Sequence, residues 1–196
     1  MKKNVVILNY SIGNFGSLIG AFKNLNCDVK VSALKTDLEK SDLIILPGVG
    51  TFPEAMKNLK KLKLDKFLRK LSKKGKKILG ICLGMQLLTD SSDELVFTKG
   101  LKIIEGKFEY LKQHNIGWSK LSYVKNKNVK GMKCEDYFFF QHNLGYIGPK
   151  KNIDAYTQGF KNLPSILRKN NTIGVQFHPE KSQHAGYNYL KNLFDE

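Results

Sequence analysis

Cysteine, tryptophan and arginine are scarce in this chain of 196 residues. The three cysteines, Cys27, Cys82 and Cys134, lie 55 and 52 positions apart, which suits neither a disulfide framework nor a cysteine-based metal site. Proteins without disulfides are typical of reducing compartments, so we expect a cytoplasmic protein. Apolar runs are also short. None approaches the roughly 18 residues that a membrane-spanning helix needs, so we expect no membrane partner.

Basic residues, in contrast, are abundant, and the net charge is +16. Such a charge raises the possibility of nucleic-acid binding. Only Arg69 and Arg168 are arginines, however, and arginine dominates base and phosphate recognition because its guanidinium is a planar fork. The lysines between residues 57 and 77 are scattered over the polar faces of expected helices. We therefore expect no nucleic-acid partner, and we interpret the charge as suited to an acidic protein or a phosphorylated substrate.

The first half of the sequence alternates short apolar runs with helical periodicity. Strand-like runs cover residues 5–8, 29–33, 42–46 and 78–81. Apolar residues recur at helical spacing from residue 14 to 25, from 55 to 62 and from 65 to 72. This alternation predicts a parallel sheet with helices on both faces.

The second half changes character, because short turns separate most of its strand-like pieces. Those pieces cover residues 102–104, 107–111, 137–141, 153–157, 165–168 and 172–176. A terminal helix from about residue 186 places Tyr189, Leu190 and Leu193 on one face. Since no repeat or linker interrupts the chain, we predict one α/β domain over residues 1–196. Its central sheet is mostly parallel, and the C-terminal half adds antiparallel strands.

Cys82 has the sequence surroundings of an exposed nucleophile. It lies in the pentapeptide Gly80-Ile81-Cys82-Leu83-Gly84, directly after an apolar strand. Glycines on both sides permit a sharp strand-to-helix turn. The N–H of Leu83 can then face a developing oxyanion, and the start of the following helix favours a thiolate.

A base and an orienting carboxylate follow far along the chain. His178 comes directly after the apolar run at residues 174–177, at the carboxyl end of an expected strand. Active sites of parallel sheets collect at those ends, so Cys82 and His178 are expected to be neighbours. Glu180 lies two residues further on and can hold the imidazole tautomer. Each residue alone also fits a structural cysteine, a loop histidine or a solvated glutamate. The combination favours nucleophilic catalysis on a carboxamide.

These motifs resemble those of the class I (triad) glutamine amidotransferases. The resemblance is carried by residues 80–86 (GICLGMQ) and 176–182 (QFHPEKS). Further segments, residues 9–15, 47–52, 116–118 and 140–143, are similar to the glutaminase subunits of imidazole glycerol phosphate synthases. The similarity spans essentially the whole chain.

The resemblance implies a role for each matching residue. Cys82 attacks the side-chain amide of L-glutamine, His178 transfers the proton, and Glu180 orients His178. Backbone N–H groups near Val49 and Leu83 hold the oxyanion. The residues implied to bind glutamine are Gly48, Gly50, Gln86, His142, Asn143 and Leu144. A helix-surface amide is the alternative for Gln86.

The resemblance also implies a heterodimer. Ammonia passes to a (β/α)8-barrel synthase subunit, which makes imidazole glycerol phosphate and aminoimidazole carboxamide ribotide for histidine biosynthesis. Asn14, Trp118 and Lys181 match positions at that interface, although Trp118 fits an ordinary core residue equally well. No metal or organic cofactor is expected, because the histidines lack ligand-like spacing.

Some residues depart from the family pattern, namely Asn9, Ser11, His114, Ser119 and Asn143. These departures leave the triad intact but bear on the pathway. The alternative is a paralogous glutaminase that supplies ammonia for amidination of a surface-polysaccharide sugar. Two other classes of protein are further alternatives: a cysteine hydrolase acting on peptides or small amides, and a non-catalytic binding homologue. Gln86 and the segment around His142 disfavour the first, and the complete triad disfavours the second.

Overall fold

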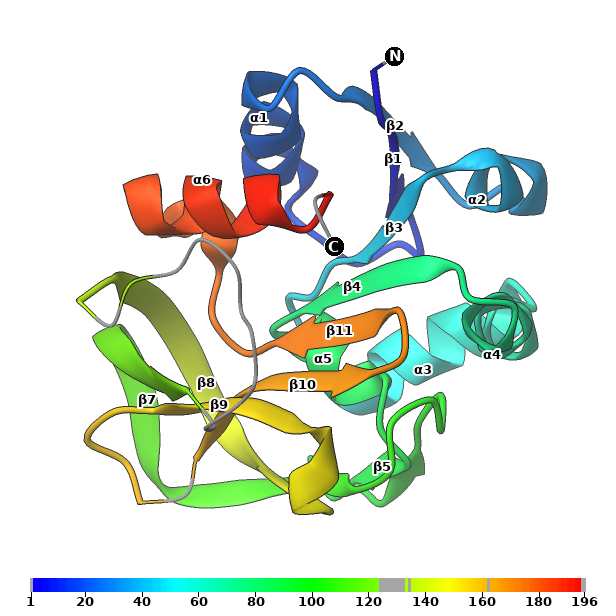
Figure 1. The fold of residues 1–196 in the computed structure, drawn as a ribbon. Coiled ribbons are helices and arrows are strands. Elements are labelled where there is room, and N and C mark those ends of the chain that lie inside the picture. The colour runs from blue at the N-terminus through cyan, green and yellow to red at the C-terminus, as the bar shows by residue number, and fades with distance from the viewer. Residues whose placement is uncertain (1, 124–132, 134, 162, 195–196) are drawn as a thin grey trace.

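The computed structural model describes residues 2–123, 133, 135–161 and 163–194 (Figure 1). Cys134 lies outside the described residues, while Cys27 and Cys82 are buried free thiols. Within the described ranges, no helix combines the length and apolar character needed to cross a membrane.

Helices and strands alternate through the first half, as the apolar pattern predicts. The strands are β1 (Asn4–Leu8), β2 (Asp28–Ser32), β3 (Leu43–Leu46), β4 (Lys77–Ile81), β5 (Ser91–Ser92), β6 (Thr98–Lys99), β7 (Lys107–Tyr123), β8 (Tyr137–Ile147), β9 (Ile153–Thr157), β10 (Pro164–Lys169) and β11 (Thr172–Val175). The helices are α1 (Phe15–Asn24), α2 (Lys35–Lys40), α3 (Phe52–Lys61), α4 (Asp65–Lys73), α5 (Leu83–Leu87) and α6 (Gln183–Asn192), with 3-10 turns η1 (Lys150–Asn152) and η2 (Pro179–Lys181).

A parallel block of five strands forms the centre, in the order β2-β1-β3-β4-β11. Beyond β11, the strands β10, β9, β7 and β8 pair antiparallel. The sheet is therefore mixed, with a parallel core and antiparallel additions, which confirms the predicted fold class. Because β1, β3, β4 and β11 run in the same direction, their carboxyl ends meet at one edge.

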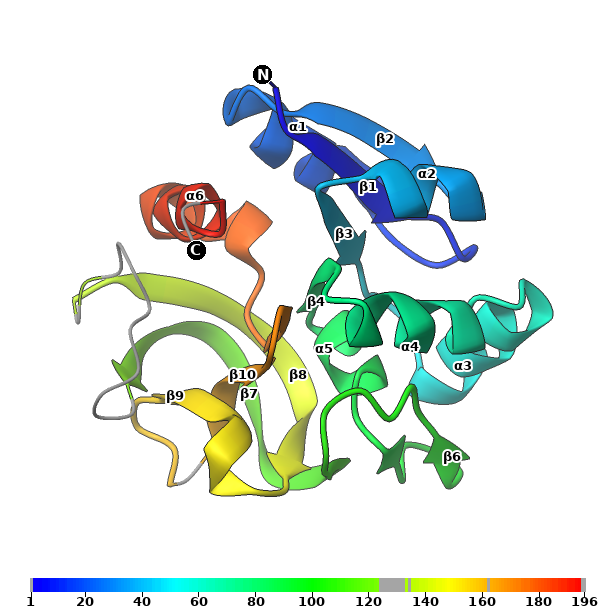
Figure 2. The same cartoon turned by 45° about the vertical axis from the view of Figure 1, so that its right-hand side comes forward.

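Helices cover both faces of the parallel block (Figure 2). One core cluster joins α2, α3, α4 and α5 to the sheet, and the other joins α1 and α6 to the opposite face. Within β1, Val6 and Leu8 belong to the first cluster, while Val5 and Ile7 belong to the second. Burial on both faces explains why these strands are continuous apolar runs instead of alternating patterns.

Four details of the prediction were wrong. Residues 102–104 form no strand, and residues 103 and 104 are bends. The N–H groups of Ile103 and Ile104 both donate to the carbonyl of Leu88, at 2.9 and 3.0 Å, just after α5. Their apolar character instead reflects burial against that helix end. The short helix α2 was not predicted. The strands β7 and β8 are longer than predicted, and α6 begins at Gln183, before residue 186.

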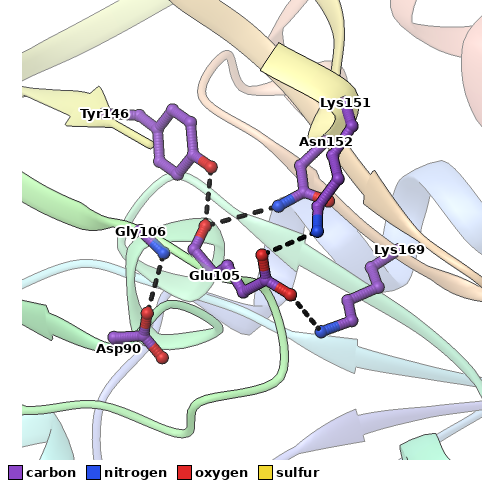
Figure 3. A network of polar contacts seen from close by, with 7 residues as sticks. All are labelled: Asp90, Glu105, Gly106, Tyr146, Lys151, Asn152 and Lys169. Atoms are coloured by element: carbon purple, nitrogen blue, oxygen red, sulfur yellow. Dashed lines mark hydrogen bonds and ion pairs between the residues drawn. The ribbon is translucent and has the colours of Figure 1, made fainter. Parts of the chain in front are cut away.

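A polar network fixes the turn that precedes β7 (Figure 3). The carbonyl oxygen of Glu105 accepts hydrogen bonds from Tyr146 Oη at 2.6 Å and from Asn152 Nδ2 at 3.4 Å. Its carboxylate pairs with Lys151 at 2.9 Å and with Lys169 at 3.4 Å. This turn is thereby tied to β8, η1 and β10. The partners of both ion pairs are about half exposed, so water screens the attraction and the pairs add little to stability.

Candidate active site

Cys82 lies on the turn between β4 and α5, at the carboxyl edge of the parallel strands. Its φ of 51° and ψ of −111° place a non-glycine residue in a sparsely populated backbone region. The Cys82 N–H donates to the carbonyl of Val175 at 2.8 Å, so the turn is anchored to β11. A strained turn held by its neighbours is the backbone geometry that presents a nucleophile.

The loop at residues 47–50 packs directly against this turn. A Cβ added to Gly48 would lie 2.4 Å from the Cβ of Leu83, and one added to Gly84 would lie 1.9 Å from the carbonyl oxygen of Leu46. Only glycine allows this close approach. In addition, the buried hydroxyl of Tyr10 donates to the carbonyl of Pro47. Burial and the nearby Cys82 raise the pKa of Tyr10 above its usual range.

His178 and Glu180 form a buried pair beyond β11. Their side chains join through His178 Nδ1 and Glu180 Oε1 at 2.8 Å, and only 5% and 7% of the two side chains are exposed. Burial lowers the pKa of His178, but hydrogen bonds and charges from Cys82 and Glu180 outweigh it and raise the pKa to about 9. The imidazole therefore holds a proton at neutral pH. Since Nδ1 bonds Glu180, Nε2 is the nitrogen left for transfer to and from Cys82.

Two buried glutamines connect the α5 helix to the thiol. Gln86 Nε2 donates to Gln176 Oε1 at 3.4 Å, and Gln176 Nε2 donates to Cys82 Sγ at 3.6 Å. Gln86 is only 4% exposed, so a surface amide is excluded. Gln176 is part of the motif at residues 176–182, but its contact with the sulfur could not be foreseen without the sheet register.

A cavity of about 200 Å³ opens at this edge of the sheet. It brings together most of the residues expected from the sequence: Gly48, Val49, Gly50, Cys82, Leu83, Gln86, His142, Asn143, Leu144 and His178. Glu180 does not line this cavity and instead supports His178 from behind. Its buried Oε2 has no hydrogen-bond partner within the described ranges, and the residue lines a second cavity of about 50 Å³.

Glu94 and Gln141 also line the larger cavity, and neither was expected as a site residue. Glu94 lies on the turn between β5 and β6, where it accepts the N–H of Phe52 at 2.6 Å. Burial raises the pKa of this carboxyl, partly offset by that hydrogen bond. The carbonyl of Gln141 faces the Cys82 thiol at 3.9 Å. No sequence pattern marks Glu94, because it lies on an irregular turn between two short strands. Gln141 lies in β8, within the segment at residues 140–143 that carries part of the resemblance, but its contact with Cys82 depends on how the strands pack.

The residues expected at a partner interface lie around the same opening. Lys181 lines both cavities, and Asn14 lines the smaller one. The Lys181 Nζ lies 5.6 Å above the ring of Phe139, and Trp118 contacts the same ring edge-on at 5.8 Å. Trp118 is 47% exposed, so it is not an ordinary core residue. Phe139 thus connects Trp118 to Lys181 on one surface.

In the described ranges, no three His, Cys, Asp or Glu side chains are grouped so that they could hold a metal ion. What the arrangement can perform is nucleophilic attack by a thiol with proton transfer by a buried imidazole.

The sequence is similar to a set of curated bacterial proteins over nearly its full length. The imidazole glycerol phosphate synthase subunit HisH of Lactococcus lactis is 38% identical over 200 residues, covering 99% of this chain and 99% of that protein. The protein of the same name from Listeria innocua is also 38% identical, covering 96% of this chain and 94% of the relative.

Solved structures agree at the level of the fold. PurLQS from Thermotoga maritima matches with a TM-score of 0.78 at 17% identity, covering all of this chain and 99% of that one. A glutamine amidotransferase crystal structure matches with a TM-score of 0.76 at 18% identity, covering 95% and 96%. The model of the family described as glutamine amidotransferase class-I matches residues 6–196. With that match and the full-length relatives, the chain belongs to the class-I glutamine amidotransferases.

Proposed function

We propose that this chain is the glutaminase subunit of an imidazole glycerol phosphate synthase and that it serves histidine biosynthesis. It hydrolyses L-glutamine to glutamate and ammonia. The observation that supports this proposal most strongly is that Cys82 and His178 line one cavity, with Glu180 buried behind His178. In addition, the chain is 38% identical to a synthase subunit over 99% of its length. Those relatives favour the histidine pathway over sugar amidination.

In the proposed reaction, Cys82 is the nucleophile and His178 transfers protons. At neutral pH His178 already holds the proton that it shares with Cys82, and the Cys82 sulfur attacks the δ-carbon of the glutamine side chain. The C–N bond then breaks as His178 returns the proton to the leaving amine, which releases ammonia and leaves a γ-glutamyl thioester. Water, deprotonated by the same imidazole, cleaves the thioester to glutamate and restores the thiol. Glu180 holds the His178 ring in orientation throughout.

The oxyanion of each tetrahedral intermediate is assigned to the backbone at Leu83 and Val49. Leu83 begins α5, so its N–H has no partner within the helix. The close packing of Gly48 on Leu83 brings the second donor segment alongside. Tyr10 holds the Pro47 carbonyl, which fixes one end of this loop while Val49, 45% exposed, remains at its surface.

The rest of the cavity suits the amino-acid headgroup of glutamine. The Glu94 carboxylate is a partner for the α-ammonium, and the backbone at Asn143 and Leu144 is a partner for the α-carboxylate. Gln86 and Gly50 complete the lining. A free amino acid carries both charges, which distinguishes this pocket from one for a peptide amide.

The synthase partner, proposed to be a (β/α)8 barrel, docks on the aromatic face of β7 and β8. Along this face Lys120 Nζ lies 5.0 Å above the ring of Tyr137, and Trp118 contacts Phe139. Lys181 joins it to the active site, with Asn14 beside it. The net charge of +16 would speed association with an acidic partner. The cytoplasm remains the predicted compartment.

The test is glutamate formation against time, with the cognate synthase subunit and its ribonucleotide substrate present. We expect strong stimulation by that pair, complete loss of turnover in Cys82→Ala, and unchanged partner binding. Cys27→Ala is the matched control, because Cys27 is a buried thiol in the α1 core, away from the cavity. Glutamine turnover retained in Cys82→Ala would remove Cys82 as the nucleophile. Binding without stimulation would point to a different synthase partner.

A further inference from the structure

The pairing of β7 with β8 breaks beside the proposed glutamine pocket. Tyr110 pairs with Leu144, and the next pair is Asn115 with His142. The four residues 111–114 of β7 therefore stand opposite one residue of β8, Asn143. The regular ladder is interrupted where Asn143 and Leu144 line the cavity, so other contacts must hold this segment.

Two side-chain hydrogen bonds take the place of the missing ladder. His142 Nδ1 lies 2.7 Å from the carbonyl oxygen of Leu144, and His142 Nε2 lies 3.0 Å from Asn115 Nδ2. Asn115 is 2% exposed and His142 is 7% exposed. A carbonyl oxygen only accepts, so Nδ1 must carry the hydrogen and donate it. In the neutral ring Nε2 then has no hydrogen and accepts from the Asn115 amide.

The ring is uncharged at neutral pH. Burial lowers the pKa of His142 to about 4, since the hydrogen bond to Leu144 offsets only part of that effect and the nearby His178 adds to it. A single tautomer is therefore fixed by its two partners. Asn115 itself does not line the cavity and can act on the pocket only through His142.

We propose that Asn115 is a positioning residue for the glutamine pocket: its amide fixes the His142 tautomer, and His142 in turn holds the Leu144 carbonyl and the adjoining pocket backbone. This role rests on the proposed function. Asn115 donates to the ring, the ring donates to Leu144, and the Asn143–Leu144 backbone is set before glutamine binds. The contribution falls on substrate binding and leaves the chemistry at Cys82 unaltered.

The test compares Asn115→Leu, which removes the donor at similar volume, with Asn152→Leu as the control. Asn152 is also buried, and its amide donates to a carbonyl, that of Glu105, at 3.4 Å, away from the cavity. In the complex with the synthase subunit, Asn115→Leu should raise the KM for glutamine about tenfold, the scale of one lost buried hydrogen bond, with kcat changed less than about threefold. Asn152→Leu should lose stability without changing KM.

A second measurement does not depend on whether the leucine variant folds. In wild-type protein, ¹⁵N resonances should show His142 protonated at Nδ1 and unprotonated at Nε2. In the nearly isosteric Asn115→Asp the carboxylate can only accept, so the ring should gain a proton at Nε2 at neutral pH. A wild-type ring protonated at Nε2, or wild-type KM in a folded Asn115→Leu, would overturn the positioning role. If wild-type protein with its partner turns over no glutamine, the proposed function fails first, and this role with it.

Discussion

Gly84→Ala is the substitution that most directly tests how the nucleophile is positioned. Gly84 lies in α5, two residues after Cys82, and an added Cβ would lie 1.9 Å from the carbonyl oxygen of Leu46. That atom belongs to β3, where Leu46 pairs with Gly80 of β4, so it cannot move aside alone. The α5 helix must instead move away from the sheet and carry the Cys82 turn with it.

The magnitude follows from the geometry. Real Cβ contacts are essentially never shorter than 3.0 Å, so the helix must shift by at least about 1 Å. Overpacking of this kind costs about 1–3 kcal/mol of stability. A displacement of 1 Å at the reacting atoms can cost about 100-fold in rate. We therefore expect kcat for glutamine hydrolysis to fall about 100-fold, with a loss of stability of about 2 kcal/mol.

The assay is glutamate release by the complex with the synthase subunit, paired with urea unfolding of the free chain. Gly20→Ala is the matched control, because Gly20 lies in the interior of α1 and an added Cβ would meet no atom within 4 Å. That variant should be active and about 0.5–1 kcal/mol more stable, as alanine is the better helix former. Gly84→Ala with wild-type kcat and stability would refute the close-packing argument.

Three further predictions follow from the triad, the docking face and the Glu105 network. Glu180→Gln removes a cause of the raised His178 pKa, so an NMR titration should show it falling from about 9. The folded pKa exceeds the unfolded value of about 6.5, so protonation of His178 stabilises the fold fully below pH 6.5, and this stabilisation is lost as the pH rises through 9. The free energy of unfolding in urea should therefore depend less on pH in Glu180→Gln than in the wild-type protein. Trp118→Ala should weaken synthase binding at least about tenfold in a calorimetric titration with little loss of stability, since the ring is 47% exposed; equal affinity would contradict the docking face. Tyr146→Phe should lower the unfolding free energy by about 1 kcal/mol, by removing the hydrogen bond to Glu105, and leave KM unchanged.

The fold prediction for the second half of the chain was only partly correct, because a local apolar pattern does not specify the structure there. Residues 102–104 have the apolar character of a strand, yet their N–H groups bond the carbonyl of Leu88 at the end of α5. The apolar side chains there pack on a helix end, and periodicity alone cannot distinguish that burial from burial in a sheet. The parallel strands were predicted well because two covered faces impose long apolar runs.

Sequence alone determined the parallel core, the turn at Cys82 and the pairing of His178 with Glu180, because each depends on residues close together in the chain or on strand ends that must share an edge. Tertiary structure alone decided the Gln176 contact with the sulfur, the Glu94 carboxylate in the pocket and the Asn115–His142 pair. These contacts join segments that no local pattern relates. Their geometry depends on the register between strands and on how closely α5 packs against the loop at residues 47–50 and the end of β3. Both are properties of the packed chain.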